Sequence, residues 1–280
     1  MTDMKRVLAA LAALLFLGSA LPAYAAAKPS PTPPPLEIEA EVIREVPEEI
    51  QQLLDLAYSE LVETNGKNLG TRNKYTKWRN NGQWGWCGGF ITWCLLELGV
   101  PQKEWAKTET GEVEGLHHVK EGGVGKLVTG YLRMNRTTMT PQKGFIVVFG
   151  NGSNKYVQGI TPNYHVGLVW DVELLENGVY RITTIEGNVS LNFTDEEGKR
   201  HKAAHTVRMY TRDYDPNAEM KKNVSLVPEE ERDREESVLF SYGYTYNNPA
   251  LYISKFLMPW VPSQYPQSEE PAETPAETAP

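Results

Sequence analysis

Two cysteines are the first candidates for nucleophilic chemistry in this sequence. Cys87 stands just before or within the first turn of an apolar pattern at helical spacing. A helix N-terminus lowers the pKa of a thiol, because its unpaired N–H groups and the helix dipole stabilise the thiolate. Cys94 follows two turns later beside Trp93 and Leu95, where a free cysteine packs as a small hydrophobe. We therefore predict Cys87 as the nucleophile and Cys94 as a core residue.

A histidine and a polar pair complete a possible site. Taken alone, Cys87 is as consistent with a packed hydrophobe, and a lone histidine at a strand end is more often structural. His165, however, opens a strand of buried character, and Glu186 and Asn188 arrive on the neighbouring strand. Their spacing of two predicts that both side chains point to one face. Cys87, His165 and either Glu186 or Asn188 would then form a nucleophile, a base and an orienting group.

The elements that must position these residues are helices first and strands second. The spacing of apolar residues predicts a helix that begins at Pro47 and ends near Val62, and another that begins around Cys87 and stops at Gly99. Strands are predicted over residues 145–149, 165–172, 179–186 and about 206–210. Asn177-Gly178 predicts a two-residue turn, since both positions tolerate positive φ, and it pairs the second and third strands antiparallel. The fold class expected is α+β, with N-terminal helices packed on an antiparallel β-sheet.

Both ends of the chain are expected to lie outside the folded domain. Residues 1–25 carry two basic residues, a short apolar run and an Ala-Tyr-Ala site, which predict a signal peptide and export. Residues 26–47 are predicted as a Pro-rich linker, and residues 263–280 as a disordered Pro/Ala/Glu/Thr tail. The catalytic domain is expected over 48–262. An uncleaved anchor is the alternative at the N-terminus, although the apolar run is shorter than the about 20 residues of a bilayer span.

Composition and cysteine spacing argue against several partners and bonds. The net charge of −8 without a basic run argues against nucleic acid as the main partner. No integral membrane partner is inferred, and a monomer is expected. If Cys87 and Cys94 share one helix, their Cα atoms lie about 10 Å apart, beyond the ~7 Å limit for a disulfide. At least one thiol should therefore be free.

The remaining histidines do not predict a metal site. His201 and His205 have helical i, i+4 spacing, but no glutamate or cysteine accompanies them as in a metalloprotease motif. His117 and His118 form a pair without such a context. Neither a metal nor a cofactor is therefore predicted.

Three sequence blocks together resemble the CHAP domain, a family of cysteine amidases and peptidases. They are WCGGFITWC at 86–94, HVGLV at 165–169 and IEGN at 185–188, in the order of the family. The resemblance covers roughly residues 66–190, with weaker support up to Pro249. It implies a papain-like layout, with the cysteine on a helix packed on the sheet that carries the histidine. Carried over by residue, it makes Cys87 the nucleophile, His165 the base, Glu186 the favoured orienting group and Asn188 a supporting contact.

The chain also departs from the family pattern. Gly144 is followed by Phe145, where CHAP-type sequences often have Gly-Asp. Gln83 is a candidate donor to an oxyanion hole, by analogy with papain-like enzymes, although its spacing from the cysteine differs. The interval between the cysteine and the histidine is long, and residues 105–140 are expected to form an insertion over the cleft that sets specificity.

The resemblance implies an exported bacterial protein of the cell envelope that hydrolyses peptidoglycan. Family members cut either between muramic acid and L-Ala, as amidases, or within stem and cross-bridge peptides, as endopeptidases, and nothing in the sequence chooses between them. Two alternatives stay open. One is a catalytically silent, wall-associated binding module that has kept the fold, and the other is a lysis or toxin-like effector that uses the same chemistry.

Overall fold

The computed structural model describes residues 45–79, 85–104, 107–108, 111, 113–151, 165–243 and 251–265. The predicted signal peptide, most of the predicted linker and tail, and Gln83 lie outside these ranges. Within them no helix is long and apolar enough to cross a membrane.

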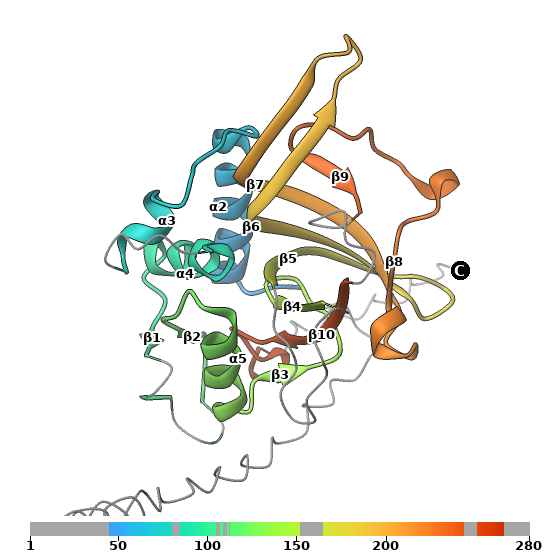
Figure 1. The fold of residues 1–280 in the computed structure, drawn as a ribbon. Coiled ribbons are helices and arrows are strands. Elements are labelled where there is room, and N and C mark those ends of the chain that lie inside the picture. The colour runs from blue at the N-terminus through green and yellow to red at the C-terminus, as the bar shows by residue number, and fades with distance from the viewer. Residues whose placement is uncertain are drawn as a thin grey trace, which may run out of the picture. The chain divides into compact units, whose positions relative to one another are not determined.

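Four helices are found in the described ranges (Figure 1): α2 (Glu48–Thr64), α3 (Lys74–Lys77), α4 (Cys87–Glu97) and α5 (Val124–Arg133). The first predicted helix is confirmed as α2, which begins after Pro47 with glutamates in its first turn. It ends where Asn65 takes a left-handed conformation, with φ 44°. The second predicted helix is confirmed as α4. The sequence did not predict α3 or α5, and α5 lies in the segment expected to be a loop insertion.

The strands form one large sheet and one small pair. They are β1 (Gln102–Lys103), β2 (His118–Val119), β3 (Thr137–Thr138), β4 (Ile146–Asn151), β5 (His165–Leu174), β6 (Tyr180–Thr194), β7 (Arg200–Tyr214), β8 (Val224–Ser225), β9 (Phe240–Tyr242) and β10 (Leu251–Leu257). The eight-stranded sheet has the order β3-β10-β4-β5-β6-β7-β8, with β9 added beside β7. Its neighbours are antiparallel except for the parallel pair of β7 and β9. The fold is thus α+β with a large, mainly antiparallel sheet.

The strands differ from the prediction chiefly in length. β6 and β7 each run for 15 residues, well past the predicted ends at Glu186 and Tyr210. Their hairpin extends beyond the other strands (Figure 1). In addition, β10 inserts between β3 and β4 although it follows β9 in sequence, a pairing that no local pattern predicted. Short helices, η2 (Met220–Lys222), η3 (Glu229–Glu231) and η4 (Pro262–Gln264), lie in the connections.

The hairpin between β5 and β6 is antiparallel as predicted, but its turn is not the predicted two-residue type. Leu174 pairs with Tyr180, and Gly178 N donates to the carbonyl of Leu175 at 2.9 Å. Gly178 has φ 80°, whereas Asn177 is not in the left-handed region. Asn177 acts through its side chain, which accepts a hydrogen bond from Val179 N at 3.0 Å. A longer loop therefore sets the register, and only the glycine needs positive φ.

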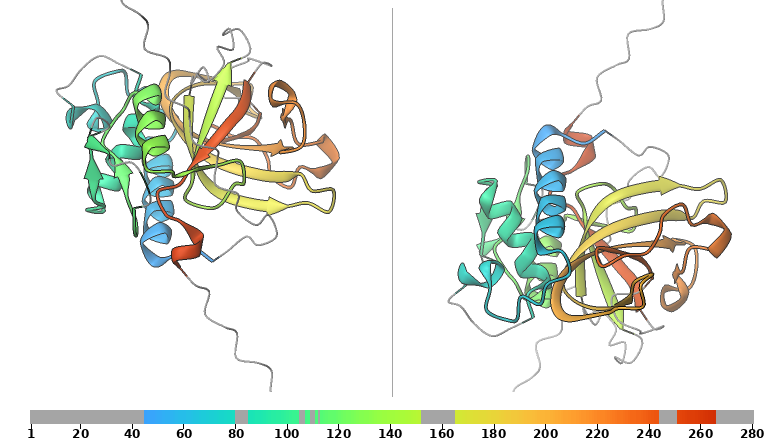
Figure 2. Two further views of the ribbon diagram at one scale, coloured as in Figure 1. Left: turned by 90° about the horizontal axis from the view of Figure 1, so that it is seen from below. Right: turned by 90° about the horizontal axis from the view of Figure 1, so that it is seen from above.

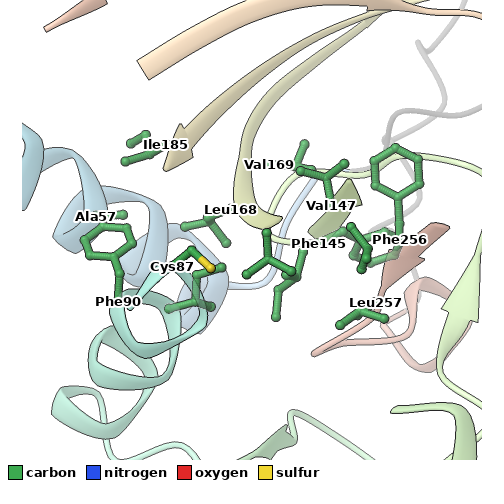
Figure 3. Close-up of a cluster of buried hydrophobic side chains, with 14 of the residues drawn as sticks. Ala57, Cys87, Phe90, Phe145, Val147, Leu168, Val169, Ile185, Phe256 and Leu257 are labelled. Carbon is green, nitrogen blue, oxygen red and sulfur yellow. The ribbon is translucent and has the colours of Figure 1, made fainter. Parts of the chain in front are cut away.

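The buried core includes residues of both the helices and the large sheet. α4 contacts β5 and β6, and α2 contacts β6 and β7. Figure 2 shows these helices on one side of the strands. At Gly187 a Cβ atom would lie 2.6 Å from Cβ of Phe90, so the glycine allows α4 to approach β6 closely. Cys87 and Phe90 of α4 belong to the same buried cluster as Leu168 of β5 and Ile185 of β6 (Figure 3).

Candidate active site

The site begins at the N-terminus of α4, where Cys87 is the first helical residue. Its side chain is 6% exposed, and both Cys87 and Cys94 are free, as the helical spacing predicted. Cys94 lies in the same helix but is fully buried, and burial raises the pKa of its thiol. Burial therefore disfavours the thiolate form of Cys94.

His165, the first residue of β5, lies beside Glu186 of β6. The Nε2 atom of His165 is 3.0 Å from Oε2 of Glu186, and both side chains are buried. Gly167 makes this pairing possible, because a Cβ atom there would lie 2.7 Å from Cγ of Glu186. The missing side chain leaves room for the carboxylate beside the imidazole.

The thiol and the imidazole are coupled electrostatically. Burial raises the pKa of Cys87, but other contributions outweigh it and the pKa is lowered. They are the charge of His165, the hydrogen bond between the thiol and His165, and backbone hydrogen bonds with Val166 and Gly88. Burial lowers the pKa of His165, while Cys87 and Glu186 raise it, and the result is about 9. Since Nε2 faces Glu186, Nδ1 is the nitrogen left for the thiol. Each group thus favours the charged form of the other, the thiolate of Cys87 and the imidazolium of His165.

Two residues that the sequence did not single out support Glu186. Nη1 of Arg212 donates to Oε1 of Glu186 at 2.7 Å, and the Thr184 hydroxyl donates to the same oxygen at 2.6 Å. Burial raises the pKa of Glu186, but Arg212, His165 and Thr184 together hold it well below its usual range. Arg212 was missed because its strand was predicted to end near Tyr210. The residues that follow Tyr210 are Thr211, Arg212 and Asp213, all polar, so no alternation of polar and apolar residues marks this end of the strand.

Asn188 does not join His165 in the structure. Its Oδ1 atom is 2.7 Å from Nδ1 of His205, and a Cβ atom at Gly85 would lie 3.3 Å from its Nδ2 atom. Asn188 and His205 both take left-handed backbone conformations, with φ 61° and 58°. The register of β6 and β7 shifts between Gly187 and Val189, so the alternation of side chains is broken there. The expectation that Glu186 and Asn188 share one face was wrong for this reason.

The other candidate histidines have ordinary polar partners. His118 is fully buried between the hydroxyl groups of Thr92 and Tyr131, at 2.9 and 2.8 Å. His201 pairs with Asp195 at 2.7 Å in the β6–β7 hairpin. In the part of the chain that the structure describes, no group of three or more His, Cys, Asp or Glu side chains is arranged to hold a metal ion.

Part of the expected insertion at 105–140 lies against the first turn of α4. A Cβ atom at Gly88 would lie 2.7 Å from the carbonyl oxygen of Gly122, so this turn and the Gly122 backbone are in close contact. Glu121 accepts hydrogen bonds from the N–H groups of Gly122 and Gly123 and from Arg79. The segment is thus held beside Cys87 and Gly88 by an internally bonded turn.

Residues 77–188 match the model of the CHAP domain. The matched segment contains Cys87, His165, Glu186 and Asn188, and it ends before Arg212. No curated protein and no solved structure matches the chain. By its sequence blocks and the family match, this chain carries a CHAP domain.

Proposed function

We propose that this protein is an exported cysteine hydrolase that cleaves amide bonds in peptidoglycan. The CHAP match implies the family of amidases and peptidases that act on this polymer. The observation that carries the proposal is the buried pair of His165 and Glu186 at 3.0 Å, together with the mutual effect of the His165 imidazole and the Cys87 thiol on their pKa values. This arrangement has the parts of a cysteine hydrolase: a nucleophile, a base and an orienting carboxylate.

In the proposed reaction, the Cys87 thiolate attacks the carbonyl carbon of the amide and forms a C–S bond. Backbone N–H groups at the start of α4 are suited to stabilise the resulting oxyanion. The His165 imidazolium then gives its proton to the amide nitrogen, the C–N bond breaks and the amine leaves. Water, deprotonated by the now neutral His165, attacks the acyl-enzyme and releases the carboxylic acid and the thiolate.

The raised pKa of His165 explains why it acts first as an acid. With a pKa of about 9, the imidazole holds its proton at neutral pH and has it available for the leaving amine. Glu186 stabilises this charged form through Nε2. Above about pH 9 the proton is lost, and with it the thiolate–imidazolium pair that begins the reaction.

We further propose a papain-like layout for the catalytic domain, which would extend over residues 48–262. Its contacts of α4 with β5 and β6 are consistent with this layout. The proposed leader, residues 1–25, would direct the protein to the cell envelope, where it would act as a monomer. Both muramoyl-L-alanine amidase and endopeptidase activity fit the site, because each requires the attack of a thiolate on an amide.

The test is digestion of purified sacculi by the chain that begins at Ala26, with mass spectrometry of the released fragments. Free lactyl groups on muramic acid would identify an amidase, and new termini within stem or cross-bridge peptides would identify an endopeptidase. Cys87→Ala serves as the inactive control. If wild-type protein binds sacculi but releases no more fragments than this variant, the protein is a silent binding module and the proposal is wrong.

A further inference from the structure

We propose that Arg212 is a positioning residue of this site, which with Thr184 holds Glu186 as an oriented, ionised carboxylate behind His165. This inference rests on the proposed cysteine-hydrolase function. It adds to the site a residue that lies outside the segment matching the CHAP family, which ends at residue 188.

The two oxygens of Glu186 have different partners. Oε1 accepts from Nη1 of Arg212 at 2.7 Å and from the Thr184 hydroxyl at 2.6 Å. Oε2 is 3.0 Å from Nε2 of His165. Because Arg212 and Thr184 engage one oxygen, the other is directed to the imidazole. The carboxylate is thereby fixed in rotation as well as in position.

Arg212 is itself rigidly held. Its Nε donates to the carbonyl of Gly243 at 3.0 Å, and its Nη1 also donates to the Thr184 hydroxyl at 2.9 Å. The guanidinium lies 4.9 Å from the ring centroid of Phe149. That ring also stacks on the His165 imidazole, with centroids 5.9 Å apart. The guanidinium is therefore held by a backbone carbonyl, a hydroxyl group and an aromatic ring, and the same ring packs on the imidazole.

The positive charge of Arg212 stabilises the ionised form of Glu186. Arg212 and Glu186 are both 0% exposed. An ionised carboxylate without a cationic partner is strongly disfavoured at such a position and takes up a proton instead. Arg212, Glu186, His165 and Cys87 form a row of alternating positive and negative groups with no net charge. Removal of the Arg212 charge should therefore destabilise the Cys87 thiolate and raise the pKa of the thiol.

The groups that face Glu186 come from several elements. His165 lies on β5, and Arg208, Tyr210 and Arg212 lie on β7, where Arg208 stands opposite Glu186 in the strand pairing. Burial raises the pKa of Tyr210 to about 12, so it stays neutral in the working range. Arg208 is buried in the same strand, but its Nη2 donates to the carbonyls of Ser237 and Phe240. Arg136 supplies the control, since it is also a buried arginine and its guanidinium donates to the backbone carbonyls of Pro259 and Val113. It precedes β3, which does not adjoin β6 in the sheet.

The experiment measures the rate at which iodoacetamide alkylates Cys87 as a function of pH, with the modified peptide identified by mass spectrometry. In Arg212→Gln the midpoint should move up by about 1 pH unit, because a weakened Glu186 charge makes the imidazolium, and hence the thiolate, less favourable. Arg212→Lys should show a smaller shift, and Arg136→Gln none. In the sacculus assay, the alkaline limb of activity should move down in Arg212→Gln.

A double variant separates positioning from a structural role. If Arg212 acts through Glu186, the midpoint of Glu186→Gln should be the same as that of Arg212→Gln/Glu186→Gln. Additive shifts, or equal midpoints in wild type and Arg212→Gln, would overturn the proposal. Should Arg212→Gln not fold, Thr184→Val decides, because loss of its hydroxyl must also raise the midpoint. Alkylation needs no peptidoglycan, so a failure of sacculus hydrolysis alone leaves this result standing and counts only against the proposed function.

Discussion

His165 and His118 are both buried in this protein, yet their charges differ. His165 contacts a thiol and a carboxylate, and its pKa is raised to about 9. His118 contacts two neutral hydroxyl groups, of Thr92 and Tyr131, and burial lowers its pKa to about 3. Burial alone favours the neutral imidazole in both regions. Anionic partners reverse that preference at one of them, and this reversal is what makes the region around His165 suitable for catalysis.

The same contrast separates the two cysteines of α4. Cys87 faces His165 and has a lowered pKa, whereas burial raises the pKa of Cys94. Glu60, the next contributor, raises it further. Partners, and not depth in the core, therefore distinguish a reactive group from a packing group in this protein.

The largest expected effect is the loss of the nucleophile. Cys87→Ala should reduce hydrolysis of sacculi by at least about 1,000-fold, because no acyl-enzyme can form. Cys94→Ala should keep activity and lower the free energy of unfolding by about 1 to 2 kcal/mol, as a small core truncation. Activity is measured by fragment release and stability by urea unfolding. Equal loss of activity in both variants would contradict the assignment of Cys87.

The second effect tests the anionic partner of His165. Measured above pH 9, Glu186→Gln should lower turnover by about 10- to 100-fold, because the protonated fraction of His165 there falls about tenfold for each unit by which its pKa drops. The folded-state pKa of His165 falls when the carboxylate charge is lost, so the alkaline limb of the pH–rate profile should move to lower pH. Asn188→Ala should have the smaller effect, because Asn188 contacts His205. A fully active Glu186→Gln beside an inactive Asn188→Ala would transfer the orienting role to Asn188.

The third effect tests the space beside the carboxylate. Measured above pH 9, Gly167→Ala should lower turnover by about tenfold, since its methyl group would push Glu186 away from His165 and lower the pKa of the imidazole by about one unit. Gly178→Ala is the control: it meets no atom within 4 Å but has φ 80°. It should lower stability by about 1 kcal/mol and leave turnover unchanged. Equal turnover in both variants would show that Glu186 needs no room at Gly167.

The smallest effect concerns the neutral histidine. Because the pKa of His118 is about 3 when folded and about 6.5 when unfolded, the unfolded chain binds the extra proton between these values. Stability therefore falls as pH decreases through this window, by up to about 1.4 kcal/mol per pH unit from this group. His118→Gln should flatten the fall in urea unfolding midpoints between pH 6.5 and 4. His201→Gln, at a partly exposed histidine, should retain it; identical slopes for wild type and His118→Gln would contradict the neutral assignment.

Local patterns in the sequence determined the elements that carry Cys87 and His165. Helix α4 starts at Cys87 because apolar spacing and Gly99 set its limits, and β5 starts at His165 because a buried run follows it. Both depend on neighbours within a few residues. Contacts of this kind are encoded along the chain, so sequence spacing was sufficient to predict them.

Tertiary structure alone decided which groups surround the imidazole. The register shift at Asn188 separates it from Glu186, and a rule of alternation cannot anticipate a bulge whose partner lies on another strand. Arg212 likewise sits at the end of a strand longer than its local pattern predicted, and an arginine is expected to be exposed unless it is paired. Contacts between distant segments stabilise the ionised form of Glu186. These contacts form only when β5, β6 and β7 pair in register.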